Sequence, residues 1–318
     1  MESRNRAVWI LIAVVAVIAC CVVVIGVAVA SGWLFFTPFR SVVGTATQGG
    51  QIEQTFQVGD VPQLTIDNFA GDVTLVGGQP GAITVVAVKH VAFVGNADRI
   101  EVILQPQEGG LLIETKKPAS MINAWVTLNI RAPAGTVLDL KTGSGTVDVS
   151  GINGGAKVHT GSGAVTAHDL KGSVDLQTGS GRVNAVTISG PLHVDTGSGQ
   201  VDLEAVVGEI NAHTGSGGMD VRLSTGPVRL ETGSGGINYQ GTPEGDCRFQ
   251  TGSGGITLRL PSDLNAQVDL HTGSGSIDVG YPVEGTQSRQ DVKGTIGSGG
   301  DTNIWAQTGS GSINLIAD

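Results

Sequence analysis

Residues 159–186 read HTGSGAVTAHDLKGSVDLQTGSGRVNAV, and the tetrapeptide TGSG occurs in this stretch twice, eighteen residues apart. A catalytic site is needed once in a protein, whereas a structural corner is needed in every coil of a repeat. The repetition therefore predicts an architecture of stacked coils. The tetrapeptide begins at Thr142, Thr160, Thr178, Thr196, Thr214, Thr232, Thr251, Thr272 and Thr308, and the variant IGSG begins at Ile296.

Each repeat contains two short stretches in which apolar and polar residues alternate, which is typical of half-buried strands. One coil alone buries too few aliphatic side chains to offset about 1 to 2 kcal/mol of backbone entropy per residue, so the coils have to stack. We therefore expect an all-β fold, a right-handed parallel β-helix or β-solenoid with coils of about eighteen residues and rungs about 4.8 Å apart. The first apolar column is Val147, Val165, Val183, Val201, Met219, Ile237, Ile256, Ile277 and Ile313.

The TGSG tetrapeptide has the composition of a sharp turn. Its glycines suit backbone angles and close contacts that other residues avoid, and the 50 glycines of the chain follow no collagen-like period. We expect the threonines to form a column of hydroxyl groups at the end of a strand, and the serines to bond the turn backbone. Nine equivalent serines cannot each have a positioned base and an oxyanion hole, so a serine nucleophile is disfavoured.

The chain divides into five parts by composition. We expect a cytoplasmic tail (1–6), a transmembrane anchor with its interface (7–36), a stalk (37–60), an irregular β section that caps the solenoid at its N-terminal end (61–141), and the TGSG-repeat solenoid (142–318). Within the solenoid, residues 280–301 read GYPVEGTQSRQDVKGTIGSGGD, which predicts a loop insertion. The segment from Asn68 to Gly71, followed by DVTLV, imitates a TGSG corner with its strand.

Residues 7–30 contain no charge and are long enough, as one helix, to cross a bilayer core of about 30 Å. Trp9 and Trp33 flank this segment, and Arg4 and Arg6 precede it. The pattern predicts one transmembrane α-helix in the cell membrane, with a cytoplasmic N-terminus and an extracytoplasmic C-terminal domain. Signal cleavage after residues 28–30 and lipidation at Cys20 are the alternatives.

Charge and cysteine content exclude several classes of protein. The net charge of −10 disfavours binding to the phosphate backbone, so we expect no nucleic-acid partner. Cys20 and Cys21 lie in the apolar segment, which leaves Cys247 as the one thiol of the repeat domain. A single thiol supports neither a disulfide framework nor a zinc site.

The chain resembles a bacterial family of domains of unknown function described as "putative adhesins". The resemblance rests on QTFQV, the segment NFAGDVTL, the serial TGSG units and the closing GTIGSGGDTNIWAQTGSGSINL, and it covers about residues 55–318. It implies a β-solenoid displayed outside the cytoplasmic membrane, often behind one N-terminal helix, with no assigned catalytic residues.

Two sets of polar side chains are candidate metal ligands. An outward column places Asp202 beside Asp220, which suggests weak divalent-cation binding, with a solvated polar ladder as the simpler interpretation. His159, His213 and His271 share another column, but they are expected three rungs apart, about 14 Å, too far to share a metal. We therefore predict no metal site and no cofactor.

The surface that best suits an external ligand carries Arg229 and Arg248 as stacked neighbours, and Trp305 is an outward-pointing tryptophan. The same outward column includes Asp175, His193, Asn211 and Asp269. We expect no catalytic residue there and no enzyme, although polysaccharide-active β-helix enzymes combine such groups.

The resulting functional hypothesis is a non-enzymatic, membrane-anchored β-solenoid that acts as a structural or adhesin-like interaction surface of the bacterial cell envelope. Its expected partners are the cytoplasmic membrane, through residues 7–36, and an unidentified envelope protein or polymer. An envelope sensor or accessory subunit is the alternative, and a polysaccharide-active enzyme is a weaker one.

Overall fold

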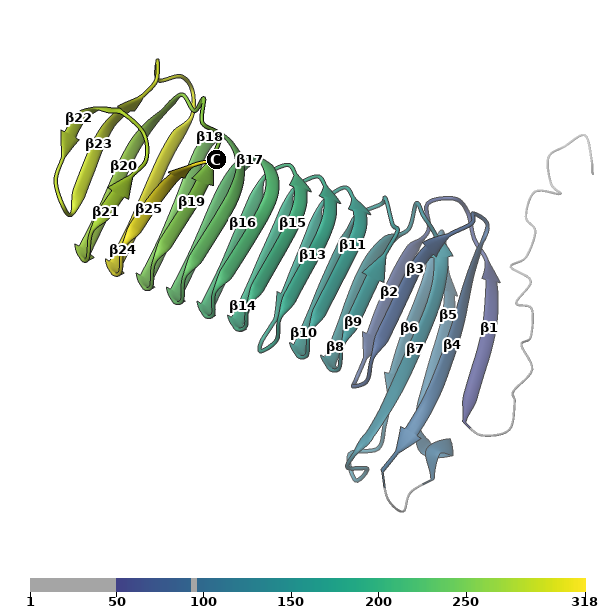
Figure 1. Ribbon diagram of the computed structural model, residues 1–318. Helices are drawn as coiled ribbons and strands as arrows, with labels where there is room; N and C mark the ends of the chain where they lie inside the picture. The colour runs from purple at the N-terminus through teal and green to yellow at the C-terminus, as the bar shows by residue number, and fades with distance from the viewer. Residues whose placement is uncertain (1–49, 93–95) are drawn as a thin grey trace, which may run out of the picture. The chain divides into compact units, whose positions relative to one another are not determined.

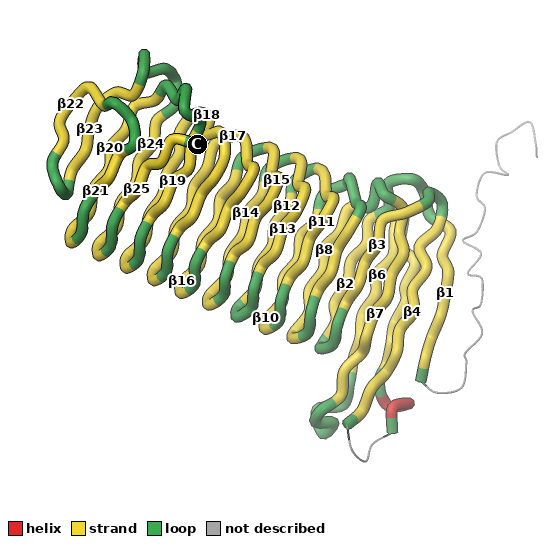
Figure 2. Tube along the Cα trace, in the orientation of Figure 1, coloured by secondary structure: helices red, strands yellow, loops and turns green. Residues whose placement is uncertain are grey.

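The structure is a computed structural model that describes residues 50–92 and 96–318, all of which belong to one compact unit, residues 42–318. In this unit the chain winds through stacked coils (Figures 1 and 2). Each coil places one strand on each of two faces, which are called face A and face B. The strands β17 (Met219–Ser234) and β18 (Ile237–Ser253) run around the corner between the faces, so that hydrogen bonds join both faces into one sheet.

Face A holds thirteen consecutive positions, with the first halves of β17 and β18 among them. In spatial order its strands are β1 (Gln51–Gln57), β4 (Ala82–Val91), β7 (Ala124–Pro133), β3 (Val73–Gly78), β9 (Val147–Ser150), β11 (Val165–Lys171), β13 (Val183–Ser189), β15 (Val201–Val207), β17, β18, β19 (Ile256–Leu260), β25 (Ile313–Ala317) and β21 (Ile277–Val279).

Face B is built in the same way and uses the second halves of β17 and β18. Its strands are, in spatial order, β5 (Glu101–Gln107), β6 (Gly110–Lys116), β2 (Gln63–Asn68), β8 (Val137–Ser144), β10 (Ala156–Ser162), β12 (Val174–Thr178), β14 (Leu192–Ser198), β16 (Ile210–Ser216), β17, β18, β24 (Asn303–Ser310), β20 (Ala266–Ser274), β23 (Asp291–Ile296) and β22 (Val283–Gln287).

The core lies between the two faces and consists of columns of inward side chains. Val147, Val165, Val183 and Val201 lie opposite one another in parallel strands and are fully buried. Complete burial of one aliphatic side chain contributes about 1.5 to 3 kcal/mol. Because each inward residue contacts its equivalents in the coils above and below, the periodic valines stabilise the stack as a whole.

From Thr178 onward, the threonine of TGSG joins its coil to the neighbouring coil on the N-terminal side of the stack. The hydroxyl of Thr178 donates to the carbonyl oxygen of Gly163 (3.0 Å), and that of Thr214 donates to Gly199 (3.1 Å). The serine takes part through its backbone, because the N–H of Gly163 donates to the carbonyl oxygen of Ser180 (3.2 Å). Thr196, Thr232, Thr251, Thr272 and Thr308 repeat the threonine contact.

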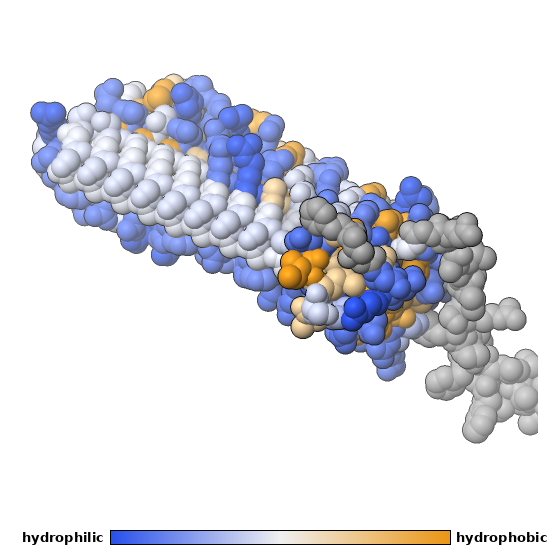
Figure 3. Space-filling model, turned by 90° about the horizontal axis from the view of Figure 1, so that it is seen from below, coloured by the Kyte–Doolittle hydropathy of each residue, from blue (hydrophilic) through white to orange (hydrophobic). Residues whose placement is uncertain are grey.

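The last glycine of TGSG is required mainly by close backbone contact. A Cβ on Gly199 would overlap the carbonyl oxygen of Gly181, although the φ angle of Gly199 is not left-handed. The stacked corners form an edge whose near-neutral hydropathy appears as a pale band in Figure 3. The steric need at this edge is therefore the same in every coil.

The second corner of the coil contains a column of residues with left-handed backbone angles. Asp169, Thr187, Ala205 and Leu223 have φ angles of 56°, 57°, 55° and 54°. In the preceding coil the equivalent position is Gly151, with φ 68°. Left-handed angles cost most residues about 1 to 2 kcal/mol, so stacking holds these four residues in an unfavourable conformation.

The C-terminal end of the stack does not follow the order of the sequence. The last coil, β24 and β25, lies between the coil of β18 and β19 and the coil of β20 and β21. β23 then covers β20 in antiparallel pairing, and β22 pairs with β23. The hydroxyl of Tyr281 donates to the carbonyl oxygen of Leu260 (2.7 Å) and so ties this end to an earlier coil.

The N-terminal end is interleaved in a similar way. The coil of β2 and β3 lies between the coil of β6 and β7 and the coil of β8 and β9. On face A, β4 pairs antiparallel with β7 and β1 with β4, while on face B β5 pairs antiparallel with β6. Asn68 lies opposite Thr142, which confirms that the segment around Asn68 imitates a TGSG corner.

Three expectations require correction. The loop expected over 280–301 contains β22 and β23, because β23 pairs with β20 and buries Val292 and Ile296. The segment 37–60, expected as a stalk, includes β1, which pairs with β4. The section 61–141 is more than a cap, because its strands β2 and β3 form a complete coil inside the stack.

The transmembrane α-helix is also corrected. In residues 50–92 and 96–318 no helix is long and apolar enough to cross a membrane, and the helix found there is the single 3-10 turn η1 (Ala97–Arg99). The helix predicted over 7–30 lies outside the described residues. The described fold is thus an all-β stack, and the single-pass membrane location that depended on the helix is not retained.

Candidate functional site

The outward side of face B brings Arg229, Arg248, Trp305 and Asp269 into register on four successive rungs. The repeat spacing predicted Arg229 beside Arg248, and the structure confirms this pair. Trp305 occupies the next rung, because the last coil is inserted there. With Lys293 of β23 opposite Asp269, these five residues are called the Arg–Trp strip.

Contacts within the strip hold its cationic groups in place. The guanidinium carbon of Arg248 lies 3.9 Å from the centroid of the Trp305 ring, a cation–π arrangement. Glu231 lies 2.7 Å from Arg229 and 3.6 Å from Arg248 and therefore bridges the two guanidinium groups. Arg248 also donates to Gln250 at 3.0 Å. The strip presents flat, oriented donors beside an aromatic ring.

Ion pairs extend this surface toward the C-terminal end. Lys293 donates to Asp269 at 2.8 Å, and this hydrogen bond with the carboxylate raises the pKa of Lys293. His271 lies 2.6 Å from Asp291. These groups are largely exposed, so each pair is screened by solvent, contributes little to stability and remains accessible to a ligand.

Two aspartates in the outward column of face A form ion pairs with arginines. Asp202 and Asp220 do lie opposite each other, as predicted. Arg182 lies 3.3 Å from Asp202, and Arg222 lies 2.7 Å from Asp220, a contact that raises the pKa of Arg222. In the part of the chain that the structure describes, no group of three or more His, Cys, Asp or Glu residues has the geometry of a metal site.

The histidine column is more widely spaced than the sequence indicated. Glu231, Gln250 and Gln307 lie between His213 and His271, so these histidines are four rungs apart and not three. The extra rung is again the inserted last coil.

Cys247 is buried, and burial raises the pKa of its thiol, which disfavours the reactive thiolate.

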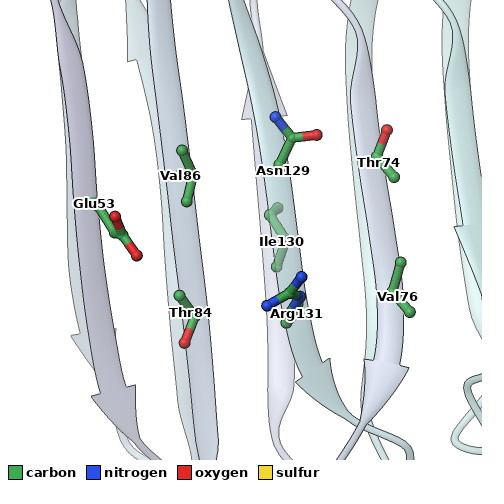
Figure 4. A pocket seen from close by; sticks show the side chains of 8 residues that line it. All are labelled: Glu53, Thr74, Val76, Thr84, Val86, Asn129, Ile130 and Arg131. Atoms are coloured by element: carbon green, nitrogen blue, oxygen red, sulfur yellow. The ribbon is translucent and has the colours of Figure 1, made fainter.

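Sequence reasoning missed a groove at the N-terminal end of face A, where β1, β4, β7 and β3 lie side by side (Figure 4). It encloses about 310 Å³. A second hollow of about 440 Å³ adjoins it and shares Val76, Thr84 and Arg131. The groove is lined by Glu53, Thr74, Val76, Thr84, Val86, Asn129, Ile130 and Arg131.

A sequence signal for the groove exists in the segment from Ile83 to Val88, which reads ITVVAV. There Val86 and Val88 stand at outward positions, where a half-exposed strand usually carries polar residues. An outward valine marks an apolar floor. The charged residues over that floor come from other strands, so the pattern alone could not identify the groove.

Comparison with models of known protein families gives a match over most of the chain. A family model described as Toastrack DUF4097 matches residues 47–225 and, again, residues 127–316. No curated protein matches the chain.

Several solved structures are similar to the chain. A "putative adhesin" from Bacteroides fragilis NCTC 9343 is 13% identical, with a TM-score of 0.41, over 84% of this chain and 97% of that chain. A "putative lipid binding protein" from Parabacteroides distasonis ATCC 8503 is 13% identical, with a TM-score of 0.46, over 85% and 98%. A "putative adhesin" from the same organism is 11% identical, with a TM-score of 0.33, over 85% and 98%.

Proposed function

The chain belongs to the Toastrack DUF4097 family, and we propose that it is a non-enzymatic, adhesin-like interaction protein whose binding surface is the Arg–Trp strip of face B. The proposal is carried by the stacking of Arg248 on Trp305 with Arg229 on the adjacent rung. Rigid, preorganised side chains lose little entropy when a ligand binds, which favours recognition.

The chemistry of the strip favours an extended envelope polymer or an envelope protein with carboxylate groups. Arg229, Arg248 and Lys293 supply hydrogen bonds suited to carboxylates, and Trp305 supplies an apolar face. The regular rung spacing of about 4.8 Å allows such a partner to contact several rungs in sequence. The net charge of −10 repels polyanions at long range, so binding depends on the local positive charge of Arg229, Arg248 and Lys293.

Binding of the full-length chain to purified acidic polysaccharide from a bacterial envelope tests the proposal. The change Arg248→Gln keeps a hydrogen-bonding side chain but removes the charge and the stacked guanidinium, and we expect it to weaken binding about fivefold. Arg182→Gln, on face A, is the matched control and should leave binding unchanged.

Two results would contradict the proposal. One is equal binding by the Arg248→Gln variant and the unaltered chain. The other is release of reducing ends from the polysaccharide by the purified protein, which would favour an enzyme. Crosslinking in intact cells tests the alternative of a protein partner, which should be captured through residues of the strip.

A further inference from the structure

We propose that the groove at the N-terminal end of face A binds a short peptide by its two charged ends, with the terminal amine at Glu53 and the terminal carboxylate at Arg131. This site is separate from the Arg–Trp strip, and the proposal does not depend on the function assigned to that strip.

Two opposite charges face the same groove from different strands (Figure 4). Glu53 lies on β1 opposite Val86 of β4, whereas Arg131 lies on β7 opposite Thr84 of β4. The salt bridges among the described residues include neither Glu53 nor Arg131. Both side chains are exposed and remain available to a ligand that carries one charge of each sign.

The spacing of the charges sets the length of the ligand. β4 lies between β1 and β7, and Glu53 and Arg131 stand opposite positions two residues apart on β4, so about 10 Å across the sheet and about 7 Å along it separate their Cα atoms by about 12 Å. An extended chain advances about 3.3 Å per residue, so a peptide of about three residues spans this distance. A single amino acid is too short to reach both charges.

The side chains at the floor of the groove indicate which kind of side chain the central residue of the peptide should carry. Val86 of β4 presents an apolar side chain between the two charges, whereas Val76 of β3, which is 44% exposed, lies beside Arg131 on the side away from Glu53. The neighbouring Asn129 and Thr74 offer polar groups at the wall of the groove. A central aliphatic side chain would cover Val86, while the peptide backbone would bond Asn129, which lies opposite Val86 on β7.

Other classes of ligand fit less well. A polyanion would be repelled by Glu53, and a simple fatty acid would leave that carboxylate without a partner. The groove is open on the outward side of a sheet, so it suits a small extended ligand better than one that must be enclosed. A zwitterionic tripeptide satisfies both charges and the floor together.

Calorimetric titration of the full-length chain with the tripeptide Ala-Val-Ala, its N-acetylated form and its C-amidated form tests the proposal. We expect saturable binding of the free tripeptide and about fivefold weaker binding of each blocked form, because each block removes one charge-assisted contact. Arg131→Gln should make the free and amidated peptides bind equally, and Glu53→Gln should do the same for the free and acetylated peptides.

Arg182→Gln is the matched control, because Arg182 lies on face A away from the groove and pairs with Asp202. This variant should bind the free, acetylated and amidated tripeptides with the same affinities as the unaltered chain. The proposal is overturned if Ala-Val-Ala shows no saturable binding, if a blocked peptide binds as well as the free one, or if Arg131→Gln retains the preference for a free carboxylate. Equal affinity for free valine would overturn the assigned length.

Discussion

In the middle of the stack each coil lies between the coils that precede and follow it in the sequence. Near each end, one coil is instead inserted between two coils that are not both its neighbours in the sequence. Residues 156–253 follow the first rule, with partners seventeen to nineteen residues apart. The coils of β2 with β3 and of β24 with β25 follow the second.

This difference shows what a repeat can and cannot specify. A repeated coil specifies its own contacts with an identical neighbour, but it does not specify where the stack stops. The ends are closed by antiparallel strands, β4 and β5 at one end and β23 at the other. These antiparallel strands end the parallel series, so another identical coil cannot simply continue the stack.

The largest effect on stability is expected from a comparison of two deletions, one in the middle of the stack and one at its C-terminal end. Removing residues 178–195 takes out one complete repeat and leaves Gln177 joined to Thr196, so the remaining coils should stack and fold. Removing 303–318 takes out the inserted coil, including the buried Ile304, Ile313 and Leu315, at a cost of about 5 kcal/mol or more.

Thermal unfolding and limited proteolysis of the two deletion variants measure this contrast. The variant without the last coil should be cleaved within residues 261–301, where β20 has lost its parallel partner. If both variants melt alike, interleaving has no special role in stability.

The next effect concerns the glycine corner of the middle region. In Gly199→Val the new side chain would overlap the carbonyl oxygen of Gly181, and we expect a loss of about 3 kcal/mol in the free energy of unfolding. Gly59→Val, near the N-terminal end, meets no atom within 4 Å and should cost far less. Ser198→Ala should also be mild. A larger loss for the serine variant in denaturant titrations would contradict the steric account.

The repeat spacing predicted much of the middle region from sequence alone. It placed Asp202 opposite Asp220 and Arg229 opposite Arg248, since one repeat there equals one rung. It did not predict Trp305 beside Arg248, because that neighbour comes from a later part of the chain. The groove was missed for the same reason, since Glu53 and Arg131 meet only through strand pairings at an interleaved end.

A smaller effect tests the threonine column. Thr214→Val removes the hydroxyl that donates to Gly199 and should cost about 1 kcal/mol. Thr160 occupies the equivalent position three rungs earlier, but its buried hydroxyl has no hydrogen-bond partner among the described residues. Thr160→Val should therefore be neutral or stabilising. Chemical unfolding of both variants gives the comparison, and equal losses would exclude the hydrogen bond as the cause.

The smallest effect concerns strain in the middle coils. Thr187 is a β-branched residue with φ 57°, and Asn tolerates this angle better. We expect Thr187→Asn to raise the free energy of unfolding by about 0.5 kcal/mol. Thr166→Asn, at an ordinary strand position, should not. A rise of equal size in both variants would show that relief of strain is not the reason.

Disulfide formation between engineered cysteines tests the inserted coil most directly. In a chain whose own Cys20, Cys21 and Cys247 are replaced, Gln250→Cys with Gln307→Cys places the pair on adjacent rungs. Gln250→Cys with His271→Cys places it two rungs apart, about 10 Å, beyond the Cα separation of about 7 Å that a disulfide spans. Mild oxidation followed by peptide mass spectrometry should give an intramolecular disulfide for the first pair and none for the second. A disulfide in the second pair and none in the first would show that the coils stack in sequence order, and would contradict the interleaved architecture.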